Sequence, residues 1–95
     1  MGPTCEVRLT SDDPSVLGVV DALVDSIAER VERWGNGRDW DLWIGGRPIY
    51  VSVDTSPPVI NLSAGCNDAE DYERLRRLAD RMTAVCGGLA TGPIK

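Results

Sequence analysis

Residues 39–64 constrain the fold most strongly, because apolar and polar side chains alternate along DWDLWIGGRPIYVSVDTSPPVINLSA. Successive side chains of a strand point to opposite faces, so this period of two predicts strands with one buried face. Gly45-Gly46 predicts a two-residue hairpin turn, since both central positions of the favoured turn need positive φ. Residues 55–58, Thr-Ser-Pro-Pro, predict the second reversal. The segment is therefore expected to form a three-stranded antiparallel meander.

The two turns also predict the register of the strands. The first turn places Leu42 opposite Ile49, and the second pairs Val53 with Ile60. With these pairings both hairpins bury the same face. A shift of one residue in either hairpin would move the apolar side chains of that strand into water, so the register and the buried face support each other. The residues expected on that face are Trp40, Leu42, Ile44, Ile49, Val51, Val53, Ile60, Leu62 and Ala64.

A long amphipathic helix is expected before the meander. Apolar residues recur at steps of three and four from Val16 to Trp34, which is the stripe of a helix packed on one side. Asp13 as N-cap followed by Pro14 at the first helical position predicts the start. Residues 35–37, Gly-Asn-Gly, predict the end.

A second amphipathic helix is expected after the meander. Asn67 is the expected N-cap of a capping box with Glu70, and Gly87-Gly88 is expected to end the helix. The stripe expected to be buried comprises Tyr72, Leu75, Leu78, Ala79, Met82, Val85 and Cys86.

The remaining elements complete an α+β architecture. Cys5, Val7 and Leu9 alternate with polar residues and predict a first strand, which could lie beside either edge of the meander. Residues 89–95 are expected to form a flexible tail. The predicted order is β-α-β-β-β-α, a two-layer sandwich of one domain, residues 1–95, with an antiparallel meander sheet and two helices on one face.

Composition narrows the functional classes. The net charge of −5 argues against nucleic-acid binding, which needs a basic patch, and suits either solubility or a basic protein partner. No apolar run reaches the ~20 residues of a membrane span, and the N-terminus lacks the features of a signal peptide. We therefore expect a cytoplasmic protein without membrane contact.

Catalytic and metal-binding motifs are not found in the sequence. Cys5, Cys66 and Cys86 are widely spaced and there is no histidine, so neither a zinc site nor another metal or cofactor site is expected. Buried thiols in a reducing compartment are the simpler interpretation, and a reactive Cys66 before the second helix is the alternative. No base accompanies that thiol, so we expect a protein that is not an enzyme.

The polar face of the meander is the candidate site. Trp43 and Tyr50 are of the residue types enriched at interface hot spots. The alternative is that both rings only cover the sheet and that the acids provide solubility. The partner-binding residues expected on this face are Asp39, Asp41, Trp43, Tyr50, Asp54 and Asn61, with Ser52 and Ser63 beside them.

An arginine cluster on the second helix is the other candidate. Arg74, Arg76, Arg77 and Arg81 are expected on its exposed sides. Pairing with Glu70, Glu73 and Asp80 is one interpretation of the cluster, and anion binding is the other.

The segment LWIGGRPIYVSV…PPVINLSAGCNDAEDY, in a small acidic α+β chain, resembles immunity proteins of bacterial polymorphic, type VI or contact-dependent toxin systems. The resemblance covers architecture and composition rather than a motif. It implies neutralisation of a cognate toxin, and the acidic face would suit a toxin with a basic substrate groove. Two alternatives stay open: a protein resembling a secretion chaperone, and a homodimeric accessory domain.

Overall fold

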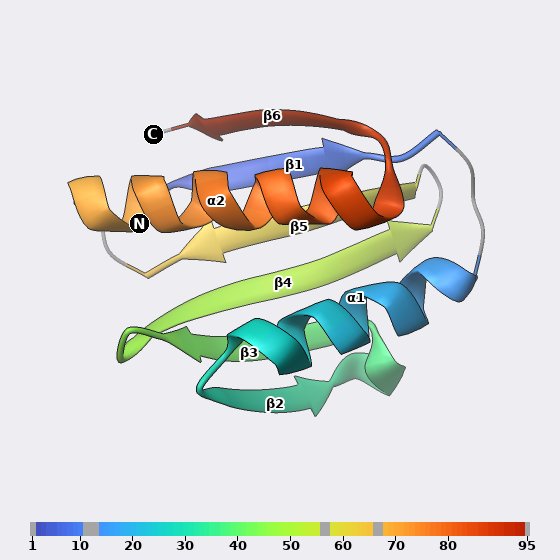
Figure 1. The fold of residues 1–95 in the computed structure, drawn as a ribbon, viewed down its shortest axis with the longest axis horizontal. Coiled ribbons are helices and arrows are strands. Elements are labelled where there is room, and N and C mark those ends of the chain that lie inside the picture. The colour runs from blue at the N-terminus through green and yellow to red at the C-terminus, as the bar shows by residue number, and fades with distance from the viewer. Residues whose placement is uncertain (1, 11–13, 56–57, 66–67, 95) are drawn as a thin grey trace.

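The computed structural model describes residues 2–10, 14–55, 58–65 and 68–94 (Figure 1). Its two α-helices, six strands and one 3₁₀ turn follow one another as β1 (Thr4–Arg8), α1 (Ser15–Ile27), β2 (Arg30–Trp34), η1 (Gly35–Gly37), β3 (Asp39–Ile44), β4 (Arg47–Thr55), β5 (Pro58–Ala64), α2 (Ala69–Cys86) and β6 (Leu89–Ile94).

The six strands form one antiparallel sheet in the order β2-β3-β4-β5-β1-β6. The first strand thus lies beside β5, which decides between the two edges left open by the sequence. Both helices lie on one side of the sheet, α1 over the β2–β4 half and α2 over β5 and β1 (Figure 1). The predicted α+β class, with two helices on one sheet face, is confirmed.

The predicted register of the meander is confirmed in both hairpins. Leu42 lies opposite Ile49, and Val53 lies opposite Ile60. Gly45 and Gly46 both have positive φ, at 62° and 75°, as the two-residue turn requires. All predicted inward-facing residues of the meander are buried except Ile44, which is partly buried.

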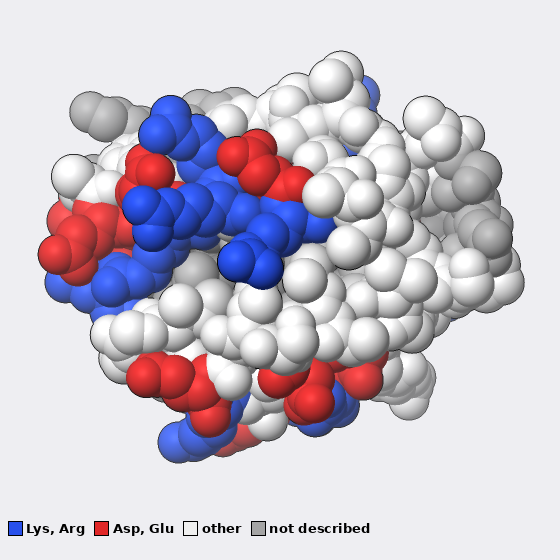
Figure 2. Space-filling model, viewed as in Figure 1, with Lys and Arg blue, Asp and Glu red and all other residues white. Residues whose placement is uncertain are grey.

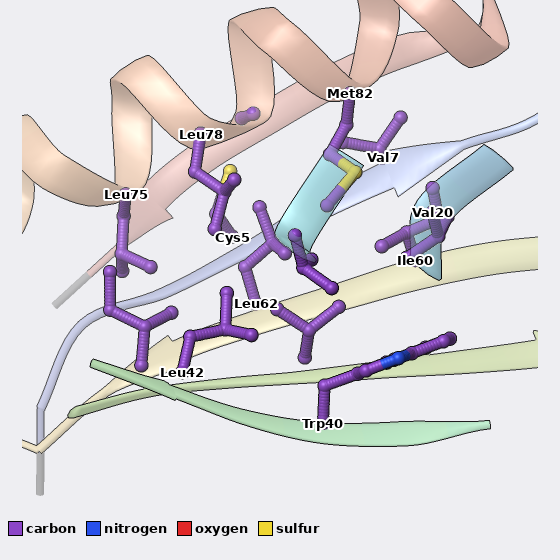
Figure 3. Close-up of a cluster of buried hydrophobic side chains, with 14 of the residues drawn as sticks. Cys5, Val7, Val20, Trp40, Leu42, Ile60, Leu62, Leu75, Leu78 and Met82 are labelled. Carbon is purple, nitrogen blue, oxygen red and sulfur yellow. The ribbon is translucent and has the colours of Figure 1, made fainter. Parts of the chain in front are cut away.

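The core lies between this face and the helices. Leu75, Leu78 and Met82 extend from α2 toward Trp40 and Leu42 of β3 and toward the neighbouring strands (Figure 3). The fully buried side chains of largest volume include Trp40, Leu42, Ile49, Ile60, Leu62, Leu75 and Met82. One apolar cluster therefore joins both helices to the sheet.

The prediction that the first helix continues to Trp34 is wrong. Helix α1 ends at Ile27, and Arg30–Trp34 forms β2 on the edge beside β3. The backbone N–H of Glu29 donates to the carbonyl of Trp43 at 2.8 Å, which brings the chain onto the sheet immediately after the helix. The proposed N-cap Asp13 lies outside the described residues.

The prediction of a flexible tail is also wrong, because Leu89–Ile94 forms strand β6 paired with β1. The thiol of Cys5 donates to the carbonyl oxygen of Thr91 at 3.1 Å across this pair. Gly88 is held against the end of β1, where a Cβ atom would lie 2.4 Å from the carbonyl oxygen of Arg8. Two strands are thus added to the predicted element order.

Helix α2 begins with an aspartate cap. The side chain of Asp68 accepts a hydrogen bond from the backbone N–H of Asp71 at 2.9 Å, whereas the predicted cap Asn67 lies outside the described residues. Arg47 of β4 forms ion pairs with both aspartates and so fastens the start of the helix to the sheet. Asp71 is 2% exposed, and Arg74 is its second cationic partner, at 3.4 Å. Val85, predicted to be buried in this helix, is 50% exposed.

A polar contact fastens α1 to the buried tryptophan. Trp40 is 1% exposed, and its indole N–H donates to Asp21 Oδ1 at 2.9 Å. Arg33 Nε of β2 donates to the same oxygen at 2.6 Å. The hydrogen bonds from Arg33 and then from Trp40 lower the pKa of Asp21, because both stabilise its ionised form.

We predict that Asp21→Ala lowers the free energy of unfolding by about 1–3 kcal/mol, because the buried indole N–H loses its acceptor. Asp21→Asn keeps an acceptor oxygen and should cost less. Since the folded-state pKa of Asp21 is lowered, its contribution is present above its unfolded-state pKa and is lost as the pH falls through the folded-state pKa. Urea unfolding at several pH values measures these changes, and equal stability of Asp21→Ala and wild type would contradict the anchoring role.

Candidate functional site

The candidate site is the sheet face that the helices leave uncovered, called the open face below. The six predicted residues all belong to the outward-facing set of the meander: Asp39, Asp41 and Trp43 on β3, Tyr50 and Asp54 on β4, and Asn61 on β5. Strand pairing brings four of them into two rows across the sheet, which are Asp39–Ser52–Asn61 and Asp41–Tyr50–Ser63. The other two lie outside these rows, Trp43 opposite Pro48 and Asp54 opposite Val59.

Strand β2 adds a third aromatic residue that the sequence interpretation placed inside a helix. Trp34 lies opposite Asp39, and its ring centroid is 5.5 Å from that of Tyr50 with the planes inclined at 33°. The indole is 51% exposed, so it is a large apolar surface beside the acids. The glycine-rich residues 35–37 between two tryptophan-bearing stretches were the signal that could have predicted a hairpin here.

Trp43 is less accessible than the sequence suggested. The guanidinium of Arg30 on β2 lies over its ring, with 4.2 Å from the central carbon to the ring centroid. That distance is within the range of a cation–π contact. Arg30 also forms an ion pair with Glu32 on the same strand. Trp43 is therefore partly covered from the β2 side, and Trp34 is the more exposed tryptophan.

The carboxylates of this face accept hydrogen bonds from neutral groups. The Tyr50 hydroxyl donates to Asp39 Oδ1, and Asn61 Nδ2 donates to Asp54 Oδ2 at 2.9 Å. Gly35 has a φ of +63° and leaves room for the Asp39 side chain, because a Cβ there would lie 1.8 Å from Oδ2. Within the described part of the chain, neither these two aspartates nor Asp41 forms an ion pair. The face therefore retains negative charge that a partner could neutralise.

The surroundings of Tyr50 raise the pKa of its hydroxyl. Burial raises its pKa, and the hydrogen bond to Asp39 raises it further. A hydrogen bond with Ser52 lowers the pKa, and the charges of Asp39 and Asp41 raise it by smaller amounts. Tyr50 thus stays protonated and holds the Asp39 carboxylate in place.

A small hollow of about 170 Å³ lies on this face, lined by Asp41, Pro48, Ile49, Tyr50, Ser63, Ala64 and Gly65. Its polar groups are a carboxylate and hydroxyls, which can accept hydrogen bonds from a cationic side chain. Across the described ranges, no group of three or more His, Cys, Asp or Glu residues could hold a metal ion. The arrangement is chemically suited to recognising a positive group.

The other two candidates from the sequence are the arginine cluster of α2 and the thiol of Cys66. Arg76 and Arg77 pair with Glu73, and Arg74 pairs with Glu70 and Asp71, so most of the arginine cluster makes local ion pairs as one interpretation expected. Cys66, the candidate reactive thiol, lies outside the described residues.

No helix of the described chain is long and apolar enough to cross a membrane.

We predict that Asp39→Ala lowers the pKa of Tyr50 toward its ordinary value, because both the acceptor and the nearest negative charge are removed. Absorbance of tyrosinate measures this, with Tyr50→Phe subtracted to remove the signal of Tyr72. Asp54→Ala is the matched control, since Asp54 bonds to Asn61 instead. Because the folded-state pKa of Tyr50 is raised, its contribution to stability is present below the unfolded-state pKa and lost as the pH rises through the folded-state pKa. An unchanged Tyr50 titration in Asp39→Ala would contradict the contact.

Comparison with protein-family models, with curated proteins and with solved structures found no match to this chain.

Proposed function

We propose that this chain is a non-enzymatic protein-binding module, an immunity protein that neutralises a cognate bacterial toxin in the cytoplasm through its open face. The observation that supports the proposal most directly is a set of carboxylates on the open face, beside Trp34 and Tyr50. These carboxylates form no ion pair with a residue that the structure describes. Aromatic anchors surrounded by unneutralised acids are suited to a basic protein surface.

The chemistry of the partner follows from the geometry of this face. The hollow beside Asp41 and Tyr50 has room for the end of a lysine or arginine side chain. The exposed Trp34 next to it supplies apolar area and a ring face for a cation. The molecule measures 33 × 25 Å across its two longer dimensions, which is enough for the roughly 800 Å² per partner of a standard interface.

Self-association through the same face is the second candidate, because Trp34 is exposed and could bury against a symmetry mate. In such a dimer Asp39, Asp41 and Asp54 would face a second acidic surface. Like charges brought together across an interface oppose binding, so a basic partner is favoured. A role like that of a secretion chaperone would use the strand edges instead.

The gene neighbourhood is the first test, because an immunity protein is expected beside the gene of its toxin. The neighbouring reading frame should encode a larger protein with a toxic domain that this chain inhibits on co-expression. A neighbour without toxicity in that assay would contradict the proposal.

We predict that Asp41→Lys abolishes protection against that toxin while leaving the fold intact, because it places a positive charge in the hollow that receives a basic side chain. Trp43→Ala should also abolish protection, through loss of apolar contact area and of the support for Arg30. Growth of cells that co-express the toxin measures the effect. Asp80→Lys is the matched control, since Asp80 is an exposed acid on α2, on the other side of the sheet.

Full protection by both open-face variants would contradict the proposed interface. Leu62→Ala separates folding from binding: its core cavity should cost about 2–5 kcal/mol of stability and reduce protection only through unfolding. Light scattering tests self-association, and a stable dimer that dissociates on Trp34→Ala or Trp43→Ala would support the homodimer instead.

A further inference from the structure

A second hollow lies on the helix side of the sheet, away from the open face. Its volume is about 390 Å³, which is within the range of small-molecule sites. It is bounded by the end of α1, the β3–β4 turn and the middle of α2, and its lining residues are Ile27, Ile44, Gly45, Arg74, Arg77, Leu78 and Arg81.

The lining combines an apolar part with a cationic part. The aliphatic surface comes from three different elements, through Ile27, Ile44 and Leu78. Leu78 belongs to the core, and the two isoleucines pack against it. The arginines come from α2 alone, and none of the described residues that line the hollow is acidic. Figure 2 shows basic side chains gathered along α2 on this side of the molecule, with acidic side chains between them.

Two of the three arginines are already held by acids. Arg74 pairs with Glu70 at 3.4 Å and reaches the β3–β4 turn, where a Cβ on Gly45 would lie 2.9 Å from its Nη2 atom. Arg77 pairs with Glu73 at 3.3 Å.

Arg81 differs from these two, because it forms no ion pair with any residue that the structure describes. One unneutralised guanidinium beside an apolar floor favours a ligand with one negative charge and an aliphatic chain. A guanidinium binds a carboxylate through two parallel hydrogen bonds, which also fixes its orientation.

We infer that this hollow binds a small aliphatic carboxylate, with its head on Arg81 and its chain on Ile27, Ile44 and Leu78. Arg74 and Arg77 add positive potential at the rim of the hollow, and their ion pairs with Glu70 and Glu73 weaken that potential. The site does not share a residue with the open face and is independent of the proposed protein partner.

Titration of the purified full chain with octanoate, followed by ¹H–¹⁵N chemical shifts, tests the inference. We expect saturable shifts that centre on Ile44, Gly45 and Leu78. Arg81→Gln should weaken binding about tenfold or more, the range for loss of a charge-assisted hydrogen bond. Arg76→Gln is the matched control, because Arg76 lies on the same helix but outside the hollow and pairs with Glu73 at 2.7 Å.

Related ligands separate the contributions of head and chain. Octylamine has the same chain with a positive head and should not bind, and butyrate should bind more weakly because its chain is shorter. Equal affinity of octanoate for Arg81→Gln and wild type would overturn the inference, as would equal binding of octylamine or an absence of saturable shifts. Circular dichroism checks that Arg81→Gln is folded, and Asp41→Lys should bind octanoate as wild type does.

Discussion

The rest of the structure depends on how Trp40 is buried. Its ring fills the space between β3 and α1, and its indole N–H must find an acceptor there, which Asp21 supplies at 2.9 Å. Because Arg33 donates to the same carboxylate oxygen, one aspartate ties the helix to both the edge strand β2 and its neighbour β3. With Trp40 on the inner face of β3, its neighbours Asp39 and Asp41 lie on the open face.

The meander could be predicted from the sequence because its information is local. The turn at Gly45-Gly46 and the alternation around it specify the pairing of Leu42 with Ile49 without reference to distant parts of the chain. Strand β2 was missed because Val31 and Trp34 also satisfy the spacing of a helix stripe, although the glycine-rich residues 35–37 were a local signal for a hairpin. The hydrogen bond from Glu29 to Trp43 and the contact of Arg33 with Asp21 favour the strand, and both are tertiary.

Strand β6 was even harder to predict from local sequence than β2. Leu89–Ile94 contains Gly92 and Pro93, which weaken any local preference for a strand. Its partner β1 lies at the other end of the chain, so this pairing depends on contacts that no sequence window contains.

The error over β2 also affected the candidate site: the six predicted residues lie on one face, but Trp34 and Arg30 were missing from it. With Arg30 over Trp43, the most exposed aromatic surface belongs to Trp34.

The two candidate surfaces meet within β3. Trp43 faces the open side and Ile44 lines the hollow against α2, because neighbouring residues of a strand point to opposite faces. A protein partner and a small carboxylate would therefore contact adjacent residues without sharing a side chain. Charge is divided in the same way: among the described residues, acids without an ion-pair partner lie on one face and Arg81 lies on the other. The sheet thus lies between an acidic surface and a basic hollow. A substitution on one face leaves the side chains of the other face unchanged.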